Sequence, residues 1–212
     1  MTDSNTVEKP ALRQVVGKAI ASLQMDLLES PPAKSAAARA TLAKLRRAAG
    51  EAAESNPLAW AAAFDILGES FVQRYENSPS HTMPDEFAAF TALTLYAVHQ
   101  QSQSKPMHFV SNNTSPLRSF GHAAGELART RDSNSIKKRF DAIVTTRNAS
   151  TRLHHLRGLT EILSTDGIGL NYGNHAEDIR SSLFPEWDQT VLRWIRDFAR
   201  SYNSPKTDQV SK

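Results

Sequence analysis

Residues 139–159, RFDAIVTTRNASTRLHHLRGL, decide the fold class of this chain. Before and after the central TTRNAS, apolar side chains recur at the spacing of one helix face, at Phe140, Ile143, Val144, Leu153, Leu156 and Leu159. This period predicts two consecutive amphipathic helices joined by a short turn. The same stretch carries four arginines and two adjacent histidines against a single acid, Asp141. We therefore expect each helix to bury one side and to carry positive charge beside it.

The rest of the chain shows the same helical period and no convincing strand alternation. Helices are predicted at residues 11–28, 35–49, 57–75, 84–100, 117–129, 135–147, 151–164, 174–183 and 186–202. Proline and glycine mark several ends, because Pro32 denies the helical conformation to the residue before it and Gly50 can cap a helix. The sequence therefore predicts an all-α protein.

A polar, proline-bounded segment at residues 105–116 interrupts this series of helices. We interpret it as a linker between two helical bundles, an N-terminal one at residues 11–104 and a C-terminal one at residues 117–202. The polar residues 203–212 are expected to form a disordered tail.

Composition excludes several classes of protein. The chain has 212 residues, of which 40% are hydrophobic and 22% charged, as in an ordinary soluble globular protein. It has no cysteine, which excludes disulfides, thiolate zinc sites and cysteine nucleophiles. The first residues lack the apolar core of a secretory signal, and no stretch approaches the roughly 18 apolar residues of a membrane span. We expect a cytoplasmic protein that does not bind membranes.

Motifs of catalysis and metal binding are weak. Gly167, Gly169 and Gly173 follow a predicted helix, but their spacing is not that of a phosphate-binding loop and no lysine-serine pair follows. The histidines lack metal-ligand spacing, and the acids are scattered singly. We expect no catalytic residue, no metal and no cofactor, although a site assembled only in space stays open.

Positive charge is concentrated in two parts of a chain whose formal net charge is only +3. Between residues 116 and 157, nine basic residues accompany three acids. The second cluster, which contains no acid, consists of Lys34, Arg39, Lys44, Arg46 and Arg47. Two such clusters favour a surface for the phosphate backbone of a nucleic acid, although two solvated helix faces would give the same pattern. Because exposed aromatic residues are not evident, we expect salt-sensitive binding without sequence preference.

Several arginines also fit structural roles. Arg157, between leucines, is placed to form an ion pair with a carboxylate such as Asp141, and Arg118 is placed to cap a helix or bind a loop. Arg147 and Arg152 lie so close to the apolar side of their helices that they fit structure or an interface as readily as DNA.

Six segments of the chain occur in an order that identifies a resemblance. They are RATLAKLRRAAG (39–50), FTALTLYAVHQQ (90–101), MHF…SPLRSFGHAAGEL (107–127), KKRFDAIVTT (137–146), HHLRGLTEIL (154–163) and IGLNYGNHAEDI (168–179). Together they resemble the CasB family, the small subunit of the type I-E CRISPR Cascade surveillance complex. The resemblance covers residues from about 35 to 200.

This resemblance implies an all-α subunit without catalytic activity that binds nucleic-acid backbone and stabilises opened target DNA in an R-loop. The implied partners are CRISPR RNA, target DNA, the Cascade backbone and large subunits, and a second copy of the chain arranged head to tail. The implied DNA-facing residues are Arg46, Arg47, Lys137, Lys138, Arg139 and Arg157.

Three further residues complete the set that we expect to contact nucleic acid. Arg39 shares its helix face with Arg46, Arg118 precedes the family's Ser-Leu-Gly-Arg-Ala pattern, and His122 stands at the arginine of that pattern. The predicted contact residues are thus Arg39, Arg46, Arg47, Arg118, His122, Lys137, Lys138, Arg139 and Arg157. The alternative hypothesis is a free-standing helical DNA-binding transcription regulator, which would need a helix that exposes base-reading side chains.

Overall fold

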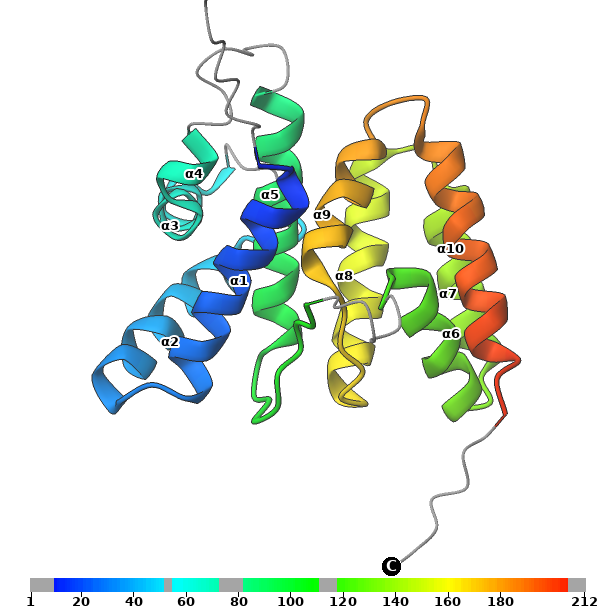
Figure 1. The fold of residues 1–212 in the computed structure, drawn as a ribbon. Helices are drawn as coiled ribbons and strands as arrows, with labels where there is room; N and C mark the ends of the chain where they lie inside the picture. Colours follow the sequence, from blue (N-terminus) through cyan, green and yellow to red (C-terminus); the bar gives the residue numbers. More distant parts are fainter. Residues whose placement is uncertain (1–9, 52–54, 73–81, 111–117, 206–212) are drawn as a thin grey trace, which may run out of the picture.

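The computed structural model describes residues 10–51, 55–72, 82–110 and 118–205 (Figure 1). Its helices are α1 (Leu12–Leu28), α2 (Pro32–Arg47), α3 (Pro57–Leu67), α4 (Glu69–Val72), α5 (Thr82–His99), α6 (Phe120–Thr130), α7 (Asn134–Thr145), α8 (Ala149–Thr165), α9 (Tyr172–Ser181) and α10 (Trp187–Tyr202). Within these ranges the extended pairing is one isolated parallel bridge between His108 and Leu170. The predicted all-α fold class is confirmed.

Side chains that the sequence places just before helices fix several of their starts. Five residues accept a hydrogen bond from the backbone N–H three positions on: Asn56, Ser119, Ser133, Asn148 and Asn171. Such caps satisfy backbone donors that have no partner inside the helix. The chain turn between α7 and α8 is thereby set by Asn148, inside the TTRNAS segment.

One predicted helix is shorter than expected. The apolar period favoured a continuous helix over 57–75, but α3 ends at Leu67 and the short α4 follows it. Gly68 separates the two with a φ of 65°, a left-handed conformation that glycine adopts without steric cost. The break therefore has a local cause. Residues 73–75 of the predicted helix lie outside the described residues.

The helices are arranged around α5, α8 and α9 (Figure 1). α1 packs against α2, α5 and α9, while α5 also contacts α8 and α9. At the other end of the molecule, α10 packs along α6, and α7 packs against α6 and α8. The middle helices thus join the N-terminal and C-terminal parts of the chain.

The apolar core runs through both parts. One cluster of buried residues includes Val16 and Leu93 from the N-terminal part and Phe120 and Leu159 from the C-terminal part. In the expected linker, Met107 is only 1% and His108 only 3% exposed. Residues 111–116 of that linker and 206–212 of the expected tail lie outside the described residues. The division into two bundles stays a prediction.

α6 and α10 approach each other closely because α6 presents two glycines to its neighbour. A Cβ added at Gly121 would overlap the backbone of Trp194, and one added at Gly125 would overlap that of Phe198. A four-residue spacing places both glycines on one side of α6. This crossing holds α10 against the core.

None of the described helices is long and apolar enough to cross a membrane.

Candidate nucleic-acid interface

The predicted contact residues on α2 lie at a concave surface. Arg39 and Arg47 are exposed and Arg46 is partly buried. Arg39 and Arg46 line a groove of about 620 Å³ that continues to Gln101 and Ser102 after α5. Within the described ranges none of these arginines forms an ion pair. Their guanidinium groups are therefore available for phosphate oxygens.

The predicted contact residues on α7 differ in their freedom. Lys138 and Arg139 are exposed, and neither is paired with an acid among the described residues. Lys137 instead donates from Nζ to the Tyr202 hydroxyl at 2.8 Å and lies 4.1 Å from the centre of that ring. Lys137 thus anchors α7 to α10. The cations of this helix that stay available for a ligand are Lys138 and Arg139.

Arg157 connects α8 to the end of α2. Its Nη1 donates to the Ala49 carbonyl, and its Nε donates to Glu161 at 3.1 Å. The ion pair is therefore with Glu161, one helical turn away, rather than with Asp141 as hypothesised. The contact brings Arg157 to the basic last turn of α2, which contains Arg46 and Arg47. Arg157 remains 39% exposed at its side chain.

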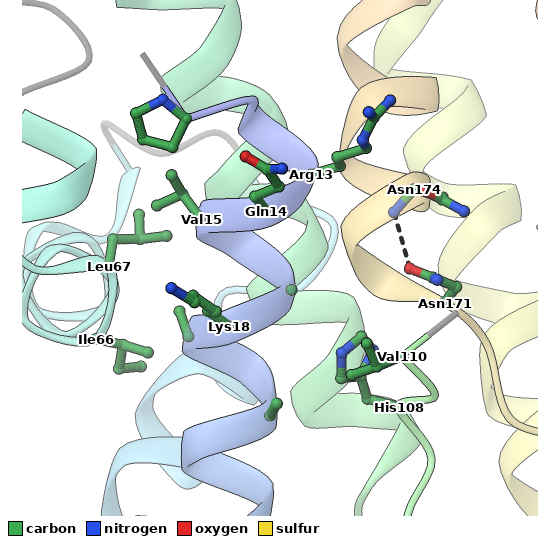
Figure 2. A pocket seen from close by; sticks show the side chains of 14 residues that line it. Arg13, Gln14, Val15, Lys18, Ile66, Leu67, His108, Val110, Asn171 and Asn174 are labelled. Carbon is green, nitrogen blue, oxygen red and sulfur yellow. Dashed lines mark hydrogen bonds between the residues drawn. The ribbon is translucent and has the colours of Figure 1, made fainter. Parts of the chain in front are cut away.

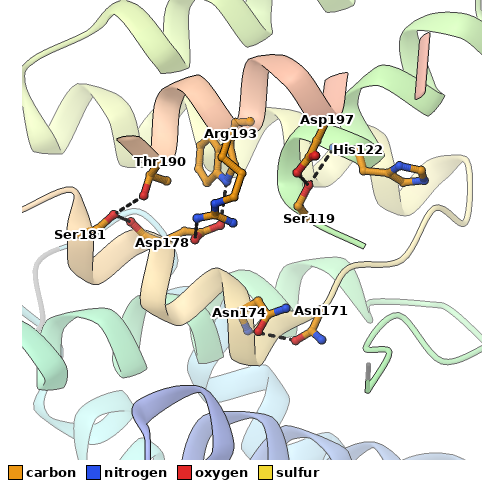
Figure 3. Close-up of polar contacts among 10 residues, drawn as sticks. Ser119, His122, Asn171, Asn174, Asp178, Ser181, Thr190, Arg193 and Asp197 are labelled. Atoms are coloured by element: carbon orange, nitrogen blue, oxygen red, sulfur yellow. Dashed lines mark hydrogen bonds and ion pairs between the residues drawn. The ribbon is translucent and has the colours of Figure 1, made fainter. Parts of the chain in front are cut away.

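The other two predicted contact residues lie near the start of α6. The Arg118 guanidinium is 4.2 Å from the centre of the Phe109 ring, and the Arg118 carbonyl accepts from the Asn171 N–H. The backbone N–H of His122 donates to Ser119 Oγ, while its ring points away from the nearby Ser119–Asp197 hydrogen bond (Figure 3). Both side chains are partly buried. The structure thus gives Arg118 a loop-binding role.

The predicted contact residues that no acid pairs with among the described residues therefore form two groups, one on α2 (Arg39, Arg46 and Arg47) and one on α7 (Lys138 and Arg139). The α2 group is joined to α8 through Arg157, and α7 packs directly against α8. Arg118 and His122 stand apart from both groups, at the start of α6.

Comparison with known proteins gives the family. The sequence model of the family described as CRISPR-associated protein Cse2 matches residues 41–198. The chain belongs to this family. The matched range contains every predicted contact residue except Arg39. No curated protein matches the chain significantly.

Solved structures show the same fold as this Cse2-family chain. CasB from Thermobifida fusca is 25% identical, with a TM-score of 0.68, over 91% of this chain and 98% of that one. M. ruber CasB is 20% identical, with a TM-score of 0.58, over 86% and 93%. A chain of a CRISPR RNA-guided surveillance complex is 19% identical, with a TM-score of 0.61, over 90% and 95%. At their lower identities, the last two support the fold alone.

Arg152 has a structural position in this Cse2-family chain. It is 3% exposed, although it sits beside an exposed part of α8. Nη2 donates to the Thr146 carbonyl at 2.8 Å, Nη1 donates to the Ser182 carbonyl at 3.3 Å, and the guanidinium lies 4.4 Å from the centre of the Trp187 ring. Burial lowers the pKa of this guanidinium. Arg147, by contrast, is exposed.

Three buried histidines form a cluster that sequence reasoning missed. His99, His108 and His175 surround Tyr172, whose hydroxyl is 2.9 Å from His99 Nδ1 and whose backbone N–H donates to His108 Nδ1 at 3.1 Å. Burial lowers the pKa of His99 and His108 to about 4 and that of His175 to about 3. The sequence carried a signal only for His99, which ends the apolar segment of α5, because His108 lies in the expected linker and His175 stands among polar residues. The three rings are thus neutral core side chains.

The histidine cluster is also relevant to the hypothesis that a catalytic or metal site forms from residues far apart in the sequence. His108 lines a cavity of about 760 Å³ beside α1, whereas His99 and His175 line neither this cavity nor the groove at Arg39 and Arg46. Among the described residues, no group of three or more His, Cys, Asp or Glu side chains is placed to hold a metal ion.

Polar contacts attach α10 to its neighbours (Figure 3). Asp178 on α9 accepts from Trp194 Nε1 at 2.7 Å and forms an ion pair with Arg193. Ser119 Oγ donates to Asp197 Oδ2 at 2.7 Å. The partners of Asp178 thus lie on α10, and the partner of Asp197 lies just before α6. We therefore assign both acids a structural role, which is to hold α10 against α9 and α6.

Proposed function

We propose that this chain is a non-catalytic small subunit of an RNA-guided CRISPR surveillance complex that holds opened target DNA through its basic surface. Its partners are CRISPR RNA, target DNA, the backbone and large subunits of the complex, and a second copy of itself arranged head to tail. The family match supports the assembly. The observation that carries the DNA-binding role is the pair of cation groups on α2 and α7, whose exposed members lack acid partners among the described residues.

The physical chemistry of R-loop formation suits such a surface. Exchanging a DNA duplex for an RNA–DNA hybrid is nearly balanced in free energy, and the guide itself supplies sequence recognition. A few contacts of about 1 kcal/mol each can then shift the balance without reading bases. Arg39, Arg46, Arg47, Lys138 and Arg139 offer phosphate contacts of this kind.

The first experiment measures DNA binding of the isolated chain against salt concentration. We expect Arg46→Ala/Arg47→Ala and Lys138→Ala/Arg139→Ala each to weaken binding about 10-fold at low salt. Each pair should also reduce the slope of log K against log salt by about 2, because two phosphate contacts are lost. Lys137 is left in place, since its contact with Tyr202 is structural.

A matched control separates local contacts from overall charge. Arg196→Ala/Arg200→Ala removes the same charge from exposed positions of α10 and should change affinity less than 3-fold. Equal losses in all three variants would contradict the proposed surface. Strong preference for one duplex sequence in a competition assay would favour the alternative, a free-standing regulator.

A further inference from the structure

The cavity beside α1 is separate from the predicted nucleic-acid surface, because none of the predicted contact residues lines it (Figure 2). Its floor is α1, where Ala21 leaves little side-chain bulk and Gly17 lies against Gly173 of α9. The end of α3 forms one wall, and the start of α9 with the segment after His108 forms the other. We call this surface the α1 groove and define it by Arg13, Lys18, Ala21, Ile66, Leu67 and Asn174. Its volume of about 760 Å³ falls within the range of ligand-binding clefts.

The charged side chains that line the α1 groove, among the described residues, are both cationic. Arg13 and Lys18 are exposed, and no described acid pairs with either. Glu177 approaches Arg13, but its Oε1 accepts from the backbone N–H at 3.2 Å and leaves the guanidinium free. Ile66 and Leu67 supply aliphatic surface on the side of α1 where Lys18 lies, whereas Arg13 lies on the side of α9 (Figure 2). A ligand that fits therefore combines an apolar body with negative charge.

Two features favour a protein segment over nucleic acid. No phenylalanine, tyrosine or tryptophan of the described ranges lines the α1 groove, so bases would find no stacking platform there. The low floor at Ala21, beside the aliphatic wall of Ile66 and Leu67, instead suits the side chains of an amphipathic helix laid along α1.

We infer that the α1 groove docks an acidic amphipathic segment of another subunit of the complex. Its apolar side chains would lie between Ala21 and the Ile66–Leu67 wall, and its carboxylates would meet Arg13 and Lys18. This inference rests on the proposed function, since it takes the chain to be a subunit. It assigns protein docking and DNA binding to different surfaces.

The test compares entry of variants into the complex. The chain is co-expressed with the other subunits and CRISPR RNA, the complex is purified through a tag on another subunit, and the occupancy of the chain is measured. Arg13→Glu/Lys18→Glu should lower occupancy at least 10-fold. Ala21→Gln, a neutral helix-compatible change that fills the floor, should lower it at least 3-fold. Circular dichroism and thermal unfolding check that each variant is folded.

Arg196→Glu/Arg200→Glu is the matched control, because it makes the same change of charge at exposed positions of α10, outside both the α1 groove and the predicted contact residues. It should change occupancy less than 2-fold, and the free chain should bind DNA equally well in both charge-reversal variants. Normal occupancy of the groove variants would overturn the docking inference alone. Absence of the unaltered chain from the complex would overturn the proposed function itself.

A photo-crosslinking amino acid at position 18 identifies the occupant in the assembled complex. Mass spectrometry should find a crosslink to a protein segment that contains several aspartates or glutamates beside apolar residues. A crosslink to RNA or DNA, a crosslink to a basic segment, or no crosslink in a fully occupied complex would each overturn the inference.

Discussion

Arg152 and Arg147 lie five residues apart on the same basic stretch and have opposite environments. The carbonyls of Thr146 and Ser182 and the ring of Trp187 hold Arg152 inside the protein. We expect Arg152→Ala to lower the free energy of unfolding by about 2–4 kcal/mol, since it leaves two carbonyls without their donors and opens a gap beside Trp187. Urea denaturation measures this loss.

Arg147→Ala is the control for that experiment, because Arg147 is exposed. It should change the free energy of unfolding by no more than about 0.5 kcal/mol. A stable Arg152→Ala protein with weakened DNA binding would show that Arg152 belongs to the interface instead.

The sequence predicted which arginines lie beside apolar stripes but not what they contact. Helical period placed Arg152 and Arg157 close to the buried side, and the structure confirms both positions. Their partners, however, include Ser182, 30 residues after Arg152, and Ala49, 108 residues before Arg157. Such pairs depend on how helices cross, which a local pattern does not contain.

The close packing of α6 against α10 depends on glycine at two positions of α6. Gly121→Ala and Gly125→Ala would each place a methyl group against the α10 backbone, which cannot rotate away as a side chain can. The helices must then separate, so we expect each change to lower the free energy of unfolding by about 2–3 kcal/mol despite the better helix propensity of alanine. Thermal unfolding monitored by circular dichroism measures the effect.

Gly158→Ala is the matched control within a helix. Gly158 lies inside α8, and a Cβ there would meet no atom within 4 Å. This change should raise the free energy of unfolding by about 0.5–1 kcal/mol, because alanine restricts the unfolded chain. If Gly121→Ala stabilised the protein as Gly158→Ala does, the close crossing of α6 and α10 would be wrong.

The presence of the helices could be predicted from the sequence, because each has its own apolar period and most have a capping residue or a proline near one end. The break at Gly68 was not predicted, since the apolar residues continue across it and only the positive φ reveals the end of α3. The close packing of Gly121 and Gly125 was equally hidden, because nothing near them in sequence indicates that α10 covers them.

At the scale of the whole molecule, the three histidines around Tyr172 make stability depend on pH. His99 comes from α5, His108 from the expected linker and His175 from α9, so the cluster lies where the two parts of the chain meet. In the folded protein their pKa values are about 4, 4 and 3, because burial disfavours the charged ring. In the unfolded chain they return to about 6.5.

Between these pKa values the unfolded chain binds more protons, so acid favours unfolding. The contribution of the three rings to stability is fully present above about pH 6.5 and is lost as the pH falls from there toward 4. We expect the free energy of unfolding to fall by about 3–4 kcal/mol from pH 6 to pH 5, because each ring contributes up to about 1.4 kcal/mol per pH unit. Urea denaturation at a series of pH values measures this slope.

A single substitution assigns the slope to the cluster. Neither ring nitrogen of His175 has a hydrogen-bond partner among the described residues, and its ring stacks on Phe120 with centroids 5.2 Å apart. His175→Phe should therefore keep the packing while removing one titrating group, and the slope between pH 6 and 5 should fall by about a third. An unchanged slope would contradict a buried neutral His175. Because the comparison is between slopes, a small packing cost from the larger ring shifts both ends of the pH range equally and leaves the conclusion intact.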